Sequence, residues 1–375
     1  MARIQSLAIL ASDKGNDYLA EKYGVVIDNI ANGTISAQLK NKDLSGDPST
    51  GTVEAKRFCN SKASPYGTAR AGGKGDKVKA KPVTVAIDNN DEIIEEVEEK
   101  DTSLYGVEGF VDRRVSNHEM VMKKSLEKAF FACAAVNCDV FTTSETEIQK
   151  VVEAAIQKVE KTKNDFVDGV PRELISVVLD TAPYGELSEY FDKLTNAGGY
   201  NTADGKVRTF HRVRCYDSTD LPEGVKFIVM VDGAVAQPVK ASVCNAAKIP
   251  FSDAYGFGVF YYHGEKSVMP DLTLTHTDGV LNATVTAGAD TTHTKVEVDM
   301  LNGAKYYYKA GATASVTVPA VGTKFAASLG FTEWNGKDEI TCASGNKIAV
   351  IEVVSGLNDS TVARATAKLD VVVGA

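Results

Sequence analysis

A long polar segment near the N-terminus constrains the fold more than any other feature of the sequence. Residues 45–82 are rich in Gly, Ser and Lys and contain few large apolar side chains. Such a segment cannot bury a core of its own, because its apolar surface is too small to offset the entropy lost on ordering. We therefore expect a long extended loop. The alternating residues Val83–Ile87 that follow it predict a β-strand.

Charge is distributed unevenly around this segment. Basic side chains cluster between residues 56 and 81, whereas acidic side chains cluster between residues 88 and 101. Opposite charges on adjacent stretches suggest contacts between copies of the chain. The alternative interpretation is two solvated surfaces of one monomer.

Residues on either side of this region predict helices. Residues 1–45 look irregular, apart from a short helix around Asn16–Lys22. A long amphipathic helix is expected farther on, where apolar residues recur at the helical period. Its apolar stripe is formed by Met122, Leu126, Ala129, Cys133 and Val136. Glu119 and Lys123 on its other face are spaced for a favourable i,i+4 pair.

The middle of the chain predicts a mixture of helices and strands. A second amphipathic helix opens at Ser144–Glu147 with a capping-box pattern and continues to Val159. A third helix is expected over Gly185–Leu194. The expected strands are Leu174–Asp180, Val207–Tyr216 and Val225–Val231. This order indicates an α+β body rather than the strict alternation of a doubly wound fold.

From about Leu272 the sequence becomes rich in Thr and Val and loses its helical patterns. The expected strands are Leu281–Val285, Lys295–Val298, Tyr306–Lys309, Ser315–Val318 and Ile348–Val354. About seven short strands over roughly a hundred residues are typical of an Ig-like β-sandwich. We expect Pro270-Asp271 to mark the joint and Trp334 to lie in the core of the sandwich.

The sequence offers no recognisable catalytic, cofactor or metal site. At Gly73-Lys74 the phosphate-loop pattern fails, because Thr68 stands where its first glycine is required. The five histidines lack the paired spacing of metal ligands, and no GxSxG motif is present. The six cysteines form no CxxC pair, so reduced thiols are expected. No run of about 18 apolar residues predicts a membrane span. We therefore expect neither an enzyme nor a membrane protein.

The order of these features resembles the major capsid proteins of tailed bacteriophages, which share the Hong-Kong-97-type fold. The resemblance covers about residues 1–270 and rests on several segments taken together. They are the loop 45–82 with its return strand, Glu95–Asp101, Asp112-Arg113-Arg114 with the helix through Val136, Pro171–Gly185, Ile249–Tyr255 and Phe260–Gly264. The C-terminal part resembles Ig-like modules that are appended to phage structural proteins.

The resemblance implies a division of the chain into named parts. They are an N-terminal arm (1–44), an E-loop (45–88), a P-domain with a long spine helix (89–140), an A-domain (141–248), closing P-domain strands (249–270) and the Ig-like sandwich (271–375).

The resemblance also implies a structural subunit of an icosahedral capsid. Copies would form hexamers and pentamers that enclose packaged double-stranded DNA, with the sandwich on the outer surface. A net charge of -9 suits such a container, because a strongly cationic wall would hold phosphates tightly. The chain would be assembled in the cytoplasm of a bacterial host, with a separate scaffolding protein and a portal, and would end in the virion. An encapsulin-like compartment shell and another phage structural protein, such as a tail tube protein, remain alternatives.

In such a shell the polar loop could become ordered by lying on a neighbouring subunit. Its lysines would then meet acidic residues of the next copy. The candidate contact residues between subunits are Lys74, Lys77, Lys79, Lys81, Glu95, Glu96, Glu98, Glu99, Arg113 and Arg114.

Overall fold

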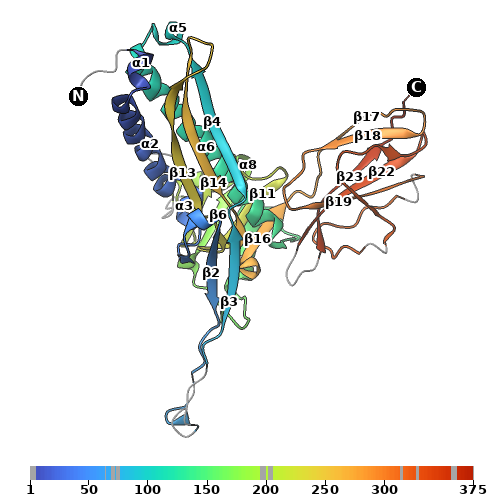
Figure 1. Cartoon of the computed structure of the whole chain (residues 1–375). Coiled ribbons are helices and arrows are strands. Elements are labelled where there is room, and N and C mark those ends of the chain that lie inside the picture. The colour runs from blue at the N-terminus through green and yellow to red at the C-terminus, as the bar shows by residue number, and fades with distance from the viewer. Residues whose placement is uncertain are drawn as a thin grey trace. The chain divides into compact units, whose positions relative to one another are not determined.

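The chain divides into two compact units, shown in the computed structural model of Figure 1. The structure describes residues 6–63, 65–68, 72, 77–194, 200–201, 206–312, 316–326, 329–355 and 361–374. The first unit consists of residues 1–56, 82–130 and 235–266, and the second of residues 57–81, 131–234 and 267–375. Neither unit is one continuous piece of sequence, so each is completed only by segments that are distant along the chain.

Helices form one side of the first unit. They are α1 (Leu7–Leu10), α2 (Asp13–Gly33), α3 (Ile35–Leu39), α5 (Glu99–Thr102) and the long helix α6 (Gly106–Val136), which leaves the unit after Phe130. The predicted long helix is confirmed and begins earlier than its apolar stripe. The short helix expected around Asn16–Lys22 is confirmed within α2. The rest of residues 1–45 is more regular than expected, because α2 continues to Gly33 and buries Leu19, Tyr23, Val26 and Ile30 along one face.

A three-stranded antiparallel sheet forms the other side of this unit. Its order is β13 (Val239–Lys248), β14 (Tyr255–His263) and β4 (Asn89–Val97). Tyr23 of α2, Met122 of α6 and Phe257 of β14 meet in the shared core. Strand β13 therefore lies in the first unit, inside the span 141–248 that the resemblance assigned to the A-domain. A smaller sheet contains β1 (Leu44–Ser45), β2 (Thr52–Phe58) and β3 (Ala80–Ala86), with the 3-10 turn η1 (Pro48–Thr50).

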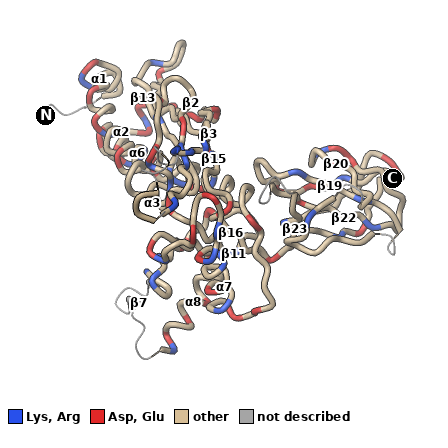
Figure 2. The backbone as a smooth tube through the Cα atoms, turned by 90° about the horizontal axis from the view of Figure 1, so that it is seen from below, with Lys and Arg blue, Asp and Glu red and all other residues tan. Residues whose placement is uncertain are grey.

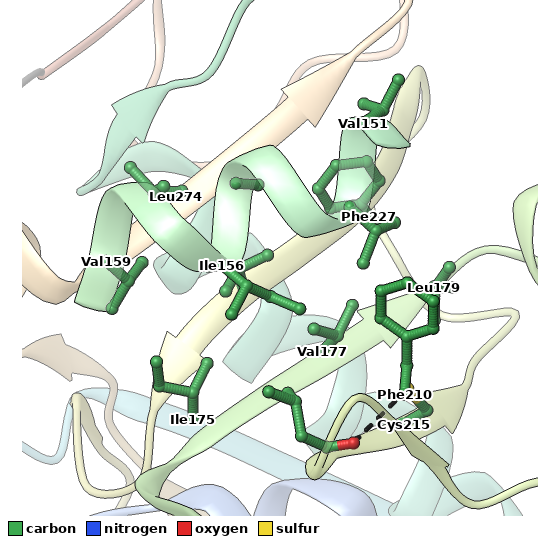
Figure 3. Close-up of a cluster of buried hydrophobic side chains, with 14 of the residues drawn as sticks. Val151, Ile156, Val159, Ile175, Val177, Leu179, Phe210, Cys215, Phe227 and Leu274 are labelled. Carbon is green, nitrogen blue, oxygen red and sulfur yellow. Dashed lines mark hydrogen bonds between the residues drawn. The ribbon is translucent and has the colours of Figure 1, made fainter. Parts of the chain in front are cut away.

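The second unit contains a six-stranded mixed sheet. Its order is β5 (Asp139–Val140), β16 (Thr273–Thr277), β11 (Val225–Val231), β6 (Ile175–Leu179), β10 (Val213–Asp217) and β9 (Thr209–Phe210). Helices α7 (Ile148–Glu160) and α8 (Thr181–Asp192) pack on it, and Figure 3 shows Ile156 of α7 beside Val177 of β6 in their common core. The predicted strands at β6 and β11 are confirmed. The predicted capping box is wrong, because Glu147 is the N-cap of α7 and makes no side-chain cap bond.

Short elements complete the part of this chain before the sandwich. They are η2 (Arg172–Leu174), β7 (Tyr200–Asn201), β8 (Lys206–Val207), β12 (Val235–Ala236), β15 (Lys266–Ser267) and η3 (Pro270–Leu272).

Strand β16 corrects the expected boundary of the C-terminal domain. It pairs antiparallel with β11 and parallel with β5, inside the six-stranded sheet. A boundary at residue 271 would therefore remove a strand from the middle of that sheet. The separate β structure begins only after Asp278.

The residues after Asp278, which we call the C-terminal sandwich, form two antiparallel sheets. One contains β17 (Ala283–Ala287), β18 (His293–Val298) and β21 (Ile340–Thr341); the other contains β20 (Thr332–Trp334), β19 (Lys305–Gly311), β22 (Lys347–Ser355) and β23 (Thr361–Asp370). Val296 and Ile340 of the first sheet share a core with Tyr306, Trp334 and Ile348 of the second. Trp334 is thus a core residue, as expected. The strand expected at 315–318 is absent from its described residues 316–318, and residue 315 lies outside the described part.

Candidate functional site

The β2–β3 hairpin is the element that the polar segment produces, and its distal part contributes little to any core. Phe58 is 59% exposed, Tyr66 90% and Val78 83%. The Cys59 N–H donates to the Lys79 carbonyl at 2.9 Å, which extends the pairing beyond the two strands. The described part of the loop thus presents apolar and basic side chains to solvent. Such surface favours contact with another molecule.

A buried ion pair holds the end of β2 within the second unit. Arg57, only 7% exposed, donates through both terminal nitrogens to the carboxylate of Asp271. The guanidinium also stacks 4.3 Å from the ring of Phe166. Burial raises the pKa of Asp271, but hydrogen bonds and the charge of Arg57 outweigh it and lower that pKa overall. The Asn60 N–H donates to the Asp165 carbonyl at 2.9 Å and adds a second attachment.

The candidate contact residues fall into two groups. Charged residues of both signs are distributed along the chain (Figure 2), so local pairing decides which are free for contacts. The exposed candidates are Lys77, Lys79 and Lys81 in the hairpin, Glu96 near the end of β4 and Glu99 at the start of α5. Lys74 lies outside the described residues.

The remaining candidates already have partners within the chain. Arg114 Nε donates to Glu95 Oε2 at 2.6 Å. Burial raises the pKa of Glu95, but the bond to Arg114 and the nearby His118 lower it overall. Glu98 caps α5 and pairs with Lys100, and Arg113 lies 4.1 Å from the Tyr105 ring. These residues are therefore weaker candidates for contacts between subunits than the hairpin lysines.

No pattern in the sequence points to the Arg57–Asp271 pair. The two residues are separated by 214 positions, and neither belongs to a recognisable motif. The basic character of the loop was visible, but the residue that anchors it could be identified only once the fold brought its partner close.

Among the described residues, no group of three or more His, Cys, Asp or Glu side chains could hold a metal ion. No helix of the described part is long and apolar enough to cross a membrane. Over the residues that the structure describes, a surface hollow of about 510 Å³ lies at Lys248–Asp253, and another of about 520 Å³ lies beside Tyr308, Trp334 and Glu339. Neither is lined by a histidine or a cysteine.

No family model and no curated protein match the chain. A chain in a solved structure of Mycobacterium phage Che8 matches with a TM-score of 0.50 and 18% identity, over 65% of this chain and 90% of that chain. The capsid structure of cyanophage P-SCSP1u matches at 0.47 and 13%, over 65% and 88%. The head structure of Helicobacter pylori bacteriophage KHP40 matches at 0.44 and 9%, over 62% and 86%. The first match shows that about two thirds of this chain share a fold with the Che8 chain.

Proposed function

We propose that this chain is the major capsid protein of a tailed phage, with a Hong-Kong-97-type fold. The observation that carries the proposal is the β2–β3 hairpin, in which Arg57–Asp271 anchors the end of β2 while Tyr66 and Val78 beyond it are exposed. An element of this kind gains stability when it lies on a second copy, because its apolar and basic surface is then covered. A fold shared with a chain from a phage structure is consistent with this proposal.

In this proposal, copies of the chain form hexamers and pentamers that close into an icosahedral shell around double-stranded DNA. The C-terminal sandwich is an Ig-like domain that decorates the outer surface. A separate scaffolding protein and a portal take part in assembly in the host cytoplasm, and the mature protein resides in the virion. The chain has a structural role and needs no enzyme activity or cofactor for it.

Electron microscopy of the expressed full chain tests this proposal, alone and together with neighbouring phage genes. We expect closed polyhedral shells built from hexamer and pentamer rings. The double variant Lys77→Glu/Lys79→Glu should form several-fold fewer shells, because like charges would then meet at the contact, and its assembly should respond differently to salt.

A matched control is the variant Lys324→Glu/Lys337→Glu, which makes the same change of charge on exposed sandwich residues and should assemble normally. Long tubes, small rings or persistent monomers of the wild-type chain under every condition would contradict the capsid function. Normal assembly and unchanged salt sensitivity of the Lys77/Lys79 variant would instead remove the hairpin lysines from the contact.

A further inference from the structure

A buried histidine lies between two carboxylates at the end of the central strand of the first unit. His263 is the last residue of β14, and its side chain is only 4% exposed. Its Nδ1 lies 2.6 Å from Glu265 Oε1, and its Nε2 lies 3.2 Å from Asp91 Oδ2. A neutral imidazole has a single N–H, whereas an imidazolium donates from both nitrogens. The geometry with one carboxylate at each nitrogen therefore suits the charged ring.

The acceptor Glu265 is itself held by side chains from other segments. Asn89 Nδ2 at the start of β4 donates to Glu265 Oε2 at 3.1 Å. Gln237 Nε2 donates to Glu265 Oε1 at 2.9 Å and to the carbonyl of Leu126 in α6 at 2.8 Å. The cluster thus connects the start of β4, the end of β14, the residues before β13 and the long helix.

This cluster lies where the β2–β3 hairpin joins the sheet of the first unit. Strand β3 ends at Ala86 and β4 begins at Asn89. Gly264 lies directly against this turn, because a Cβ on it would be 1.8 Å from the Ala86 carbonyl oxygen. The Ile87 N–H donates to the Gly51 carbonyl at 2.8 Å and ties the turn to the other hairpin strand. Residues 263–265 therefore hold the base of the hairpin.

We propose that His263, Asp91 and Glu265 form a proton-dependent latch for the base of the hairpin. The imidazolium bridges Asp91 of β4 and Glu265 beyond β14, and so holds the turn between β3 and β4 against the sheet. Loss of the proton leaves one N–H for two carboxylates. One carboxylate then loses its donor, and the start of β4 is held less tightly.

The surroundings of the ring set the direction of the pH dependence. The described titratable groups that face it are Asp91 from β4, Glu265, and Tyr261 of β14 itself, whose ring stacks 6.0 Å away. Strand β13 brings the apolar Val239 beside His263, and α6 reaches the cluster through the Leu126 carbonyl. Burial lowers the pKa of His263, but the hydrogen bonds and charges of Glu265 and Asp91 outweigh it and raise that pKa overall.

Because the folded-state pKa lies above the unfolded value, the latch is fully closed at low pH. Its contribution is lost as the pH rises through the raised pKa. The other buried histidine of this unit, His118, has the opposite pH dependence. Burial lowers its pKa, so its protonation at low pH reduces stability, and this loss disappears as the pH rises. Of these two histidines, only His263 therefore predicts that the base of the hairpin loses order as the pH rises.

Hydrogen exchange of the full chain between pH 5.5 and 8.5 tests the latch. Relative to the variant His263→Gln at the same pH, exchange in residues 86–91 should be slower at low pH by roughly tenfold, the lower end of what a hydrogen bond to a charged group contributes. The difference should disappear at high pH. The control His293→Gln, in the C-terminal sandwich, should keep the wild-type profile.

Direct titration of the His263 ring by NMR keeps the test decisive if His263→Gln does not fold. The wild-type pKa should lie above the ordinary histidine value, and Asp91→Asn should lower it. A ring that titrates at or below the ordinary value, or wild-type protection of residues 86–91 that matches His263→Gln at every pH, would overturn the latch. The latch belongs to a single chain, so its failure would leave the capsid proposal untouched.

Discussion

At the scale of single residues, the most buried ionic contact lies inside the second unit. Arg364 and Glu352 of the C-terminal sandwich are 3% and 1% exposed and pair with each other. The Tyr306 hydroxyl donates to Glu352 at 2.8 Å, and Arg364 also donates to the carbonyl of Glu223 at 3.2 Å. Since Glu223 precedes β11, the pair connects the sandwich to the six-stranded sheet. The pair stabilises the fold because the Glu352 carboxylate, the Arg364 guanidinium and the Glu223 carbonyl each gain a partner.

The variant Arg364→Ala should lose about 3–5 kcal/mol of unfolding free energy, because it leaves Glu352 buried without a cation. Urea unfolding followed by the fluorescence of Trp334, the single tryptophan, reports on the sandwich that contains it. The control Lys347→Ala breaks the pair with Asp370, whose side chain is 83% exposed, and should cost less than about 1 kcal/mol. Equal losses in the two variants would show that the buried pair has no special role.

At the scale of elements, the close pairing of β14 with β4 depends on a glycine. Gly258 pairs with Ile94, and a Cβ at this position would lie 2.0 Å from the Ile93 carbonyl oxygen. The variant Gly258→Ala should therefore push β4 away and cost about 1–3 kcal/mol, measured by thermal unfolding. The control Gly185→Ala in α8 meets nothing within 4 Å and should stabilise slightly, because alanine favours helices. A neutral Gly258→Ala would mean that β4 can shift without loss.

Elements with a regular apolar pattern were predictable from the sequence, and others were not. The apolar composition of the fully buried β6 predicts a strand, and the helical period of the apolar stripe in α7 predicts a helix. Strand β4 is hard to recognise from sequence. It is an edge strand with Glu92 and Glu96 exposed to solvent, so its sequence indicates only an acidic surface. The latch at His263 had no signal, since Asp91 is separated from it by 172 residues.

At the scale of the whole molecule, the boundary of the C-terminal sandwich decides how the chain can be divided. Composition changes near Pro270, but composition cannot reveal which sheet a strand joins. Strand β16 has the Thr-rich sequence of the sandwich and nevertheless pairs with β11. Val136 and Val140 also share a buried cluster with Val354 and Val362 of the sandwich.

Two truncations separate these effects. A chain that ends at Pro270 should be insoluble, because it lacks β16 and exposes the edges of β5 and β11. A chain that ends at Gly279 keeps β16 and should remain folded, although it uncovers Val136 and Val140 and should associate more readily. Soluble yield and circular dichroism of the two chains measure the difference. Equal yields would show that β16 is dispensable for the sheet.

The position of β16 also has a consequence for synthesis on the ribosome. Cys138, next to β5, bonds across the sheet to Thr275 of β16, and 137 residues separate the two. At about 5–20 residues per second, the ribosome needs roughly 7–27 s to make the intervening chain. During that time β5 has no partner strand beside it, because β16 is its neighbour in the sheet. A nascent chain of this protein therefore passes through a long stage in which the incomplete six-stranded sheet can pair with strands of other molecules. A chaperone that shields strand edges should have its greatest effect during this stage.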